Sequence, residues 1–63
     1  MKIDINKYAK RKQATILKDL SGHGIRDGKI VKILDVGNDG KEDYVKVQYK
    51  NNIEYIYYEE EIE

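Results

Sequence analysis

The second half of the chain carries the hydrophobic pattern of β-strands. Residues 28–36 are apolar or β-branched at most positions, which is typical of a strand that packs on both sides or bends sharply. Residues 37–40 (Gly-Asn-Asp-Gly) interrupt this run, because these residue types tolerate the conformations that turns require. Residues 43–50 then alternate strictly, which predicts a half-buried strand. One face of that strand carries Val45, Val47 and Tyr49, and the other carries Tyr44, Lys46 and Gln48.

A hairpin turn and a last strand follow. Residues 53–58 have the composition of a strand. The preceding Asn51-Asn52 predicts a two-residue turn, because Asn enters the left-handed region more readily than any residue except Gly. The chain ends in the acidic run 59–63, whose single apolar residue, Ile62, is expected to point back toward the core.

The first half allows two interpretations. A helix over residues 5–20 would align most of its apolar residues on one face, but two polar residues interrupt the middle of that face. The alternative is a short helical turn over residues 4–11, a strand over residues 13–18 and a long loop over residues 19–27. We favour the second interpretation, because β-branched residues prefer the extended conformation and the glycines that follow are typical of a loop.

The predicted order of elements is compatible with a small closed barrel, because closure removes the exposed edges of a sheet. One set of residues carries a resemblance to a known class of fold: Ala14-Thr15-Ile16-Leu17, Ser21-Gly22-His23-Gly24-Ile25, Gly28, Val31, Ile33 and the segment from Tyr55 to Ile62. Through these residues the chain resembles small SH3-like barrels, notably the KOW- and Tudor-like ones and short uncharacterised barrels from bacteria and phages. This resemblance implies an all-β, five-stranded SH3-like barrel over residues 13–62, preceded by an N-terminal extension (residues 1–12) with a short helical turn, in a single domain spanning residues 1–63.

Length and composition exclude several classes of protein. The chain of 63 residues is long enough for one small domain and too short for a second core. Twelve basic and twelve acidic side chains give a net charge of zero, which argues against binding nucleic acid through overall charge. There is no Cys, and no apolar run reaches the ~18 residues of a membrane span. We therefore expect a cytoplasmic protein without a membrane anchor.

The charge is unevenly distributed along the chain. Residues 1–20 contain six basic and two acidic side chains (+4), whereas residues 54–63 contain five Glu and no basic residue (−5). In an SH3-like barrel the first and last strands are neighbours, so Lys10, Arg11 and Lys12 are expected to face residues 59–63 and to be neutralised by them. The alternative is that these three residues and Lys7 remain free to bind phosphate.

Catalysis and metal binding are not expected. Ser21 and His23 are the only Ser and the only His, and their proximity in sequence does not supply the geometry of a nucleophile and its base. A single His without Cys cannot form a zinc site from soft ligands. We expect no enzyme activity, no metal and no cofactor. His23 is expected either to bond the backbone of its own loop or to contact a ligand.

The tyrosines are the main indication of function. Tyr combines a large contact area with a hydroxyl group, so it is favoured at protein interfaces. The resemblance implies that Ile56 lies in the core, which puts Tyr55 and Tyr57 on the outer face, where Tyr44 can join them. The alternative explanation is that the tyrosines stabilise an exposed sheet through contacts between neighbouring strands. The residues expected to contact a partner are Tyr44, Tyr55, Tyr57, Tyr58, His23 and Arg26.

Three functions remain open from the sequence. The first is a non-catalytic protein-interaction module, a monomer or a homodimer; the resemblance adds the expectation of a phage- or mobile-element protein that binds and modulates a host protein. The second is a nucleic-acid-binding barrel that uses Lys7, Lys10, Arg11, Lys12 and Arg26. The third is an oligomer that binds a small anionic ligand through His23 and Arg26.

Overall fold

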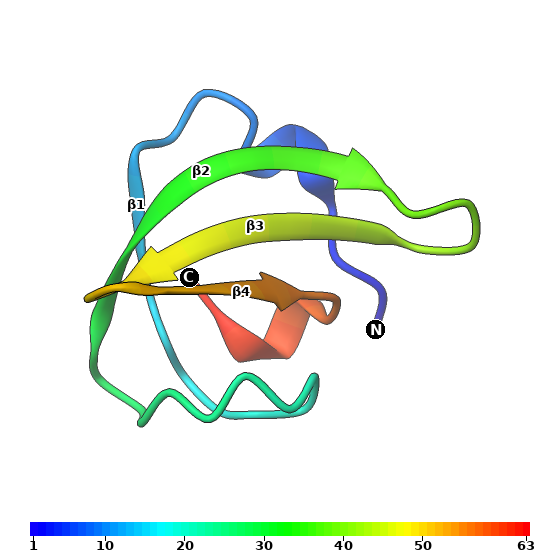
Figure 1. Ribbon diagram of the computed structural model, residues 1–63. Helices are drawn as coiled ribbons and strands as arrows, with labels where there is room; N and C mark the ends of the chain where they lie inside the picture. Colours follow the sequence, from blue (N-terminus) through cyan, green and yellow to red (C-terminus); the bar gives the residue numbers. More distant parts are fainter.

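A computed structural model describes all 63 residues, and it is mostly β. Four strands form one antiparallel sheet in the order β1-β2-β3-β4, and the only helical segments are two short 3₁₀ turns, η1 and η2 (Figure 1). The elements are η1 (Ile5–Lys7), β1 (Gln13–Thr15), β2 (Ile30–Asn38), β3 (Asp43–Tyr49), β4 (Asn52–Ile56) and η2 (Glu59–Glu61).

The first half of the chain folds as a short turn, a strand and a long loop. The continuous helix over residues 5–20 is wrong: only Ile5–Lys7 are helical, and Asp4 accepts a hydrogen bond from the Asn6 N–H at 3.1 Å as their N-cap. The strand is shorter than predicted, since β1 ends at Thr15. The long loop passes beneath the sheet in Figure 1 before the chain enters β2.

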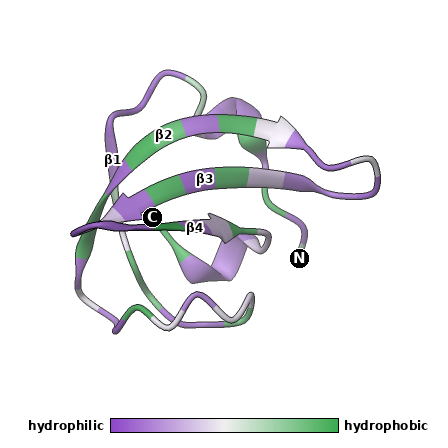
Figure 2. Ribbon diagram, in the orientation of Figure 1, coloured by the Kyte–Doolittle hydropathy of each residue, from purple (hydrophilic) through white to green (hydrophobic).

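The strand β3 follows the predicted alternation. Val45 and Val47 are fully buried, whereas residues 44, 46 and 48, which alternate with them, are only partly buried. Figure 2 shows the hydrophobic and hydrophilic bands along β3. In β2 the register shifts between Ile33 and Asp35, and this bulge bends the strand over the core. The tight turn lies one residue earlier than predicted. Because Tyr49 pairs with Asn52, Lys50 and Asn51 form the turn instead of Asn51 and Asn52.

The two ends of the chain lie against the sheet. Ile16, just beyond β1, forms an isolated bridge with Ile62, and Lys2 forms another with Tyr58. The Thr15 N–H donates to the Glu63 carbonyl at 3.0 Å and the Glu63 N–H donates to the Thr15 carbonyl at 3.0 Å. The C-terminal residues thus take part in isolated bridges, not in a fifth strand.

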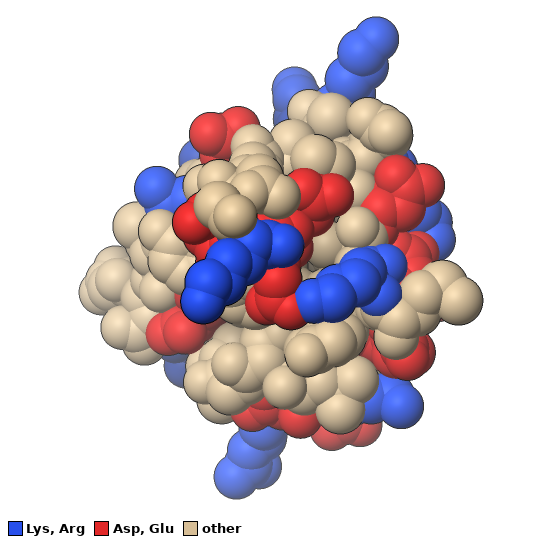
Figure 3. Space-filling model, turned by 90° about the vertical axis from the view of Figure 1, so that its right-hand side faces the viewer, with Lys and Arg blue, Asp and Glu red and all other residues tan.

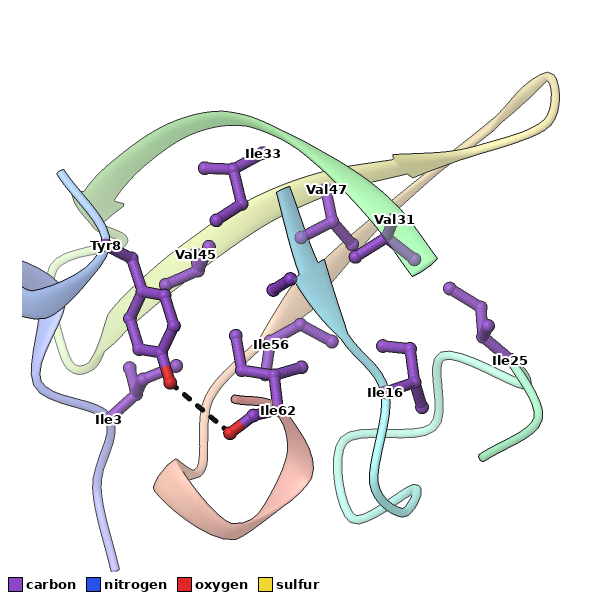
Figure 4. Close-up of a cluster of buried hydrophobic side chains, with 11 residues drawn as sticks. Ile3, Tyr8, Ile16, Ile25, Val31, Ile33, Val45, Val47, Ile56 and Ile62 are labelled. Atoms are coloured by element: carbon purple, nitrogen blue, oxygen red, sulfur yellow. Dashed lines mark hydrogen bonds between the residues drawn. The ribbon is translucent and has the colours of Figure 1, made fainter. Parts of the chain in front are cut away.

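The core lies between the concave face of the sheet and these two ends (Figure 4). Tyr8 and Ile56 are fully buried, and Ile62 points inward, as the sequence predicts. The Tyr8 hydroxyl donates to the Ile62 carbonyl at 3.3 Å, so the segment after η1 and the C-terminus are joined inside the core. The buried apolar residues are Ile3, Tyr8, Ala14, Ile16, Ile25, Val31, Ile33, Val45, Val47, Ile56 and Ile62.

Opposite charges meet where the N-terminal and C-terminal segments approach each other. Lys7 Nζ lies 2.7 Å from Glu59, and the N-terminal amine lies 2.9 Å from Glu60. Basic and acidic side chains are interspersed on the side of the molecule shown in Figure 3. No helix of the structure has the length and hydrophobicity needed to cross a membrane.

Candidate protein-binding surface

Three tyrosines gather on the outer face of the sheet, and we refer to Tyr44, Tyr55 and Tyr57 as the tyrosine cluster. Tyr44 lies on β3, Tyr55 on β4 and Tyr57 immediately after β4. The Tyr44 ring lies 5.0 Å from the Tyr55 ring and 6.4 Å from the Tyr57 ring, centre to centre, and both pairs are edge-to-face. Such pairs contribute about 0.5–1.5 kcal/mol beyond the area they bury. The cluster is therefore a preformed aromatic surface on a strand pair.

The cluster retains exposed area and its polar groups. Tyr55 remains 41% exposed, and the neighbouring Ile53 on the same face of β4 remains 49% exposed. Partial desolvation, followed by the nearby Asp39 carboxylate, raises the pKa of the Tyr57 phenol. The phenol is protonated near neutral pH, so its hydroxyl can donate a hydrogen bond at the surface.

The outer edge of β4 is open beside this cluster. Only β3 pairs with β4 in the sheet. In a two-residue hairpin the residues that flank the turn, here Tyr49 and Asn52, exchange hydrogen bonds. Along an antiparallel pair of strands, hydrogen-bonded pairs of residues alternate with pairs that do not bond to each other. Ile53 and Tyr55 therefore direct their peptide groups away from β3, and no other segment of the chain bonds to them.

The same edge is closed two residues further on. The Tyr57 N–H donates to Ser21 Oγ at 3.0 Å, and the Tyr57 carbonyl accepts from the Ile3 N–H at 3.0 Å. The free part of the edge is thus confined to Ile53 and Tyr55, directly beside the tyrosine cluster.

Two of the expected contact residues lie elsewhere. Tyr58 forms an isolated bridge with Lys2, whose Nζ lies 6.0 Å from the centre of the Tyr58 ring. Arg26 lies in the long loop, at a pocket to which the tyrosine cluster does not contribute. The structure therefore brings together Tyr44, Tyr55 and Tyr57 but neither Tyr58 nor Arg26.

His23 is an interior residue of the long loop. Its side chain is fully buried, and Nδ1 accepts a hydrogen bond from the Ile25 N–H at 2.9 Å. The ring proton therefore lies on Nε2, which donates to the Lys18 carbonyl at 3.1 Å. Two roles were considered for His23, and the structure shows the first of them: the ring bonds the backbone of its own loop.

A buried carboxylate that the sequence does not reveal holds the same loop. Glu61 is fully buried, and its Oε1 accepts hydrogen bonds from the Leu20 and Ser21 N–H groups, both at 2.7 Å. Its Oε2 accepts from the Ser21 hydroxyl and from the N–H groups of Tyr57 and Tyr58, at 3.3 Å and 3.1 Å. Glu61 thus joins the long loop to the segment that follows β4.

Asp19 organises the tip of the loop in a similar way. Its Oδ1 accepts from the N–H groups of Gly22 at 2.7 Å and His23 at 3.0 Å, and its Oδ2 accepts from Gly24 at 2.9 Å. These hydrogen bonds lower the pKa of the Asp19 carboxyl, because they favour its charged form. The bond from the Gly24 N–H makes the largest contribution. Gly22 and Gly24 have positive φ angles of 85° and 73°, which this tight wrap around a carboxylate requires.

The cluster of Asp19, His23 and Glu61 does not have the geometry of a metal or catalytic site. Their ligand atoms lie within 4.8 Å of one another, but His23 presents the protonated Nε2 to the two carboxylates. A metal ligand must present a free lone pair, and this nitrogen carries a proton. The Ser21 hydroxyl donates to Glu61 and not to His23, so Ser21 and His23 do not form a nucleophile–base pair. These groups hold the loop in place.

The basic residues of the nucleic-acid hypothesis do not form one free patch. Lys7 is paired with Glu59, whose pKa is lowered first by the Asp4 N–H and then by Lys7. Arg11 donates to the carbonyls of Gln13 at 3.1 Å and Glu63 at 3.0 Å, and it lies over the Tyr8 ring. Lys10 and Lys12 are exposed without ion pairs.

Comparison with known proteins yields no relative. No protein-family model, curated protein or solved structure matches the chain.

Proposed function

We propose that this chain is a non-catalytic protein-interaction module that binds its partner through the tyrosine cluster. The observation that carries the proposal is the edge-to-face packing of three tyrosines on an outward-facing strand pair, with Ile53 beside them. Aromatic residues held rigid by a sheet lose little conformational entropy on binding, and Tyr is enriched among the residues that dominate binding energy.

The open edge of β4 supports the same proposal. An extended segment of a partner can add to an exposed strand, where main-chain hydrogen bonds give affinity and alternate side chains give specificity. Ile53 and Tyr55 offer their peptide groups at this edge and their side chains on the adjoining face. We propose that the partner contributes such a segment and covers the tyrosine cluster with its side chains.

For the fold, we propose a small SH3-like barrel closed by the C-terminal segment. The isolated bridge between Ile16 and Ile62 and the reciprocal bonds between Thr15 and Glu63 support this proposal, because they place the C-terminal residues along β1. In such a barrel a fifth strand joins the first, and the tyrosine cluster lies on the outer face of the barrel.

The test is quantitative affinity capture from a bacterial lysate with the immobilised domain, read out by mass spectrometry. The Tyr55→Ala/Tyr57→Ala double variant should recover the specific partner at least about tenfold less well than the wild type. Ile30→Ala is the matched control, because Ile30 is a 59% exposed apolar residue of β2 outside the cluster. Equal recovery of every captured protein by the double variant and the wild type, with both folded by circular dichroism, would refute the proposed surface.

A further inference from the structure

A second surface feature lies apart from the tyrosine cluster. The end of the long loop and the β3–β4 turn enclose a pocket of about 370 Å³. Its lining residues are Gly24, Ile25, Arg26, Lys29, Tyr49 and Lys50. Residues 24–29 and 49–50 are far apart in the sequence, so the fold itself brings these side chains together.

The pocket is positively charged and lacks internal counterions. Arg26, Lys29 and Lys50 line it, and no acidic residue does. None of the three has a carboxylate oxygen within 4.0 Å or a side-chain hydrogen bond within the protein, in contrast to Lys2, which pairs with Glu42, and Lys7. Like charges gathered in this way repel one another, and an anion in the pocket would relieve that repulsion.

The backbone at Lys50 provides an independent indication. Lys50 is the only residue other than glycine with a positive φ angle, at 56°. This position of a tight turn favours Gly, Asn or Asp, and the next two residues are both Asn. A long basic side chain therefore occupies a position for which its backbone preference is poor. Such exceptions concentrate at functional positions.

The residues that line the pocket indicate which class of anion it can bind. Lys50 Nζ lies 5.4 Å from the centre of the Tyr49 ring, so the cation is held at the pocket wall. Tyr49 offers apolar surface to the organic part of a ligand, while the three cations complement the negative charge of a phosphate group. Arg recognises phosphate through its planar fork of donors, and Lys does so as a point charge.

We propose that this pocket binds a phosphate ester, with Arg26, Lys29 and Lys50 contacting the phosphate. This site differs from the anion site expected from the sequence: it keeps Arg26, replaces His23 with Lys29 and Lys50, and requires no oligomer, because one chain supplies all of its residues. It is separate from the proposed protein-binding surface, and the two proposals stand or fall independently.

The test is an NMR titration of the ¹⁵N-labelled protein at low salt with three probes: pyrophosphate, ADP and a short single-stranded oligonucleotide. Binding should shift the amide signals of residues 24–29 and 49–50 and should weaken as salt is added. Preference for ADP or for the oligonucleotide would identify a nucleotide or a strand as the source of the ester, whereas tighter binding of pyrophosphate than of both would overturn the assignment to an ester. The absence of binding by all three probes would overturn the proposal.

Lys50→Asn is the decisive variant, because Asn removes the charge while suiting the left-handed backbone. It should bind the preferred probe about tenfold more weakly than the wild type, while its thermal stability is equal or higher. Lys41→Asn is the matched control, since Lys41 is an exposed lysine of the other hairpin turn and does not line the pocket; its affinity should not change. Equal affinity of Lys50→Asn and the wild type, or shifts confined to residues outside the pocket, would also overturn the proposal.

Discussion

Tyr44 lies across Gly37, its partner in the β2–β3 ladder, and its hydroxyl oxygen comes within 2.7 Å of the point that a Cβ atom on residue 37 would occupy. The ring atom Cζ lies 2.9 Å from the same point. These distances are shorter than side-chain contacts allow, so any other residue at position 37 must displace the ring. Gly37 is thus the residue that leaves room for the Tyr44 ring beside Tyr55 and Tyr57.

Gly37→Ala should therefore disrupt the tyrosine cluster without unfolding the domain. The free energy of unfolding should change by less than about 1 kcal/mol, because Ala lowers the entropy of the unfolded chain while the displaced ring moves into solvent. The near-ultraviolet circular dichroism of the packed tyrosines should decrease, and capture of the partner should fall. In a Tyr44→Ala background the same substitution should leave both readouts unchanged. An unaltered spectrum and unaltered capture in the single variant would contradict this account.

The strands of the second half were predictable because the alternation of residues 43–50 directly encodes a two-sided strand. The inward face assigned to Val45 and Val47 agrees with the burial observed, and Tyr49 packs partly against the same core. The tight turn was misplaced by one residue. Local preference favours Asn at both turn positions, but pairing of Tyr49 with Asn52 places Lys50 in the turn instead.

The groups that hold the long loop were not predictable. Glu59, Glu60 and Glu61 are identical in sequence, and nothing local distinguishes the buried Glu61 from its two neighbours. The distinction arises from tertiary structure, since Leu20 and Ser21 approach from 40 residues away with unpaired N–H groups. The basic pocket has the same origin, because only strand pairing brings the β3–β4 turn beside residues 24–29.

Acid should destabilise the domain, because three carboxylates that stabilise the fold become protonated. The pKa values of Asp19, Glu59 and Glu60 are lowered, chiefly by the Gly24 N–H, the Asp4 N–H and the N-terminal amine, respectively. A carboxyl whose pKa is lowered in the folded state stabilises the fold at pH values above its pKa in the unfolded chain, here 3.8 for Asp and 4.5 for Glu. This stabilisation is lost as the pH falls through the pKa of the folded state.

Thermal unfolding between about pH 6 and pH 2 should show this loss, beginning below about pH 4.5. Asp19→Asn should make the melting temperature less dependent on pH at the acid end. Asp27→Asn, which removes an exposed charge that accepts no hydrogen bond, is the control for the change in net charge. A melting temperature that stays constant from pH 5 to about pH 2.5 would show that these bonds do not contribute to stability.

The hydroxyl of Tyr8 should contribute measurably to the core. Its bond to the Ile62 carbonyl is buried, so Tyr8→Phe leaves that carbonyl without this partner and should cost about 1 kcal/mol. Tyr49→Phe is the matched control: Tyr49 packs partly against the same core, but its hydroxyl makes no hydrogen bond. Urea denaturation of the two variants distinguishes them, and equal stability of both would indicate that the bond adds nothing.

Glu61→Gln should be the most destabilising single-atom change in the molecule. The carboxylate accepts five hydrogen bonds from Leu20, Ser21, Tyr57 and Tyr58, whereas an amide offers one acceptor oxygen and turns an NH₂ group toward donors. Bonds to a buried charged group are worth about 1.5–3 kcal/mol, and removing one partner leaves the remaining buried groups unsatisfied. We expect a loss of about 2–3 kcal/mol, a large fraction of the about 3–5 kcal/mol typical of a domain this small.

Urea denaturation followed by circular dichroism measures this loss, with Glu63→Gln as the exposed control that should change stability by less than about 0.5 kcal/mol. Hydrogen exchange adds spatial detail, because the amides of Leu20 and Ser21 should lose protection even under conditions in which the strands remain folded. If Glu61→Gln is as stable as the wild type and keeps those two amides protected, then the long loop is held by Asp19 and His23 alone.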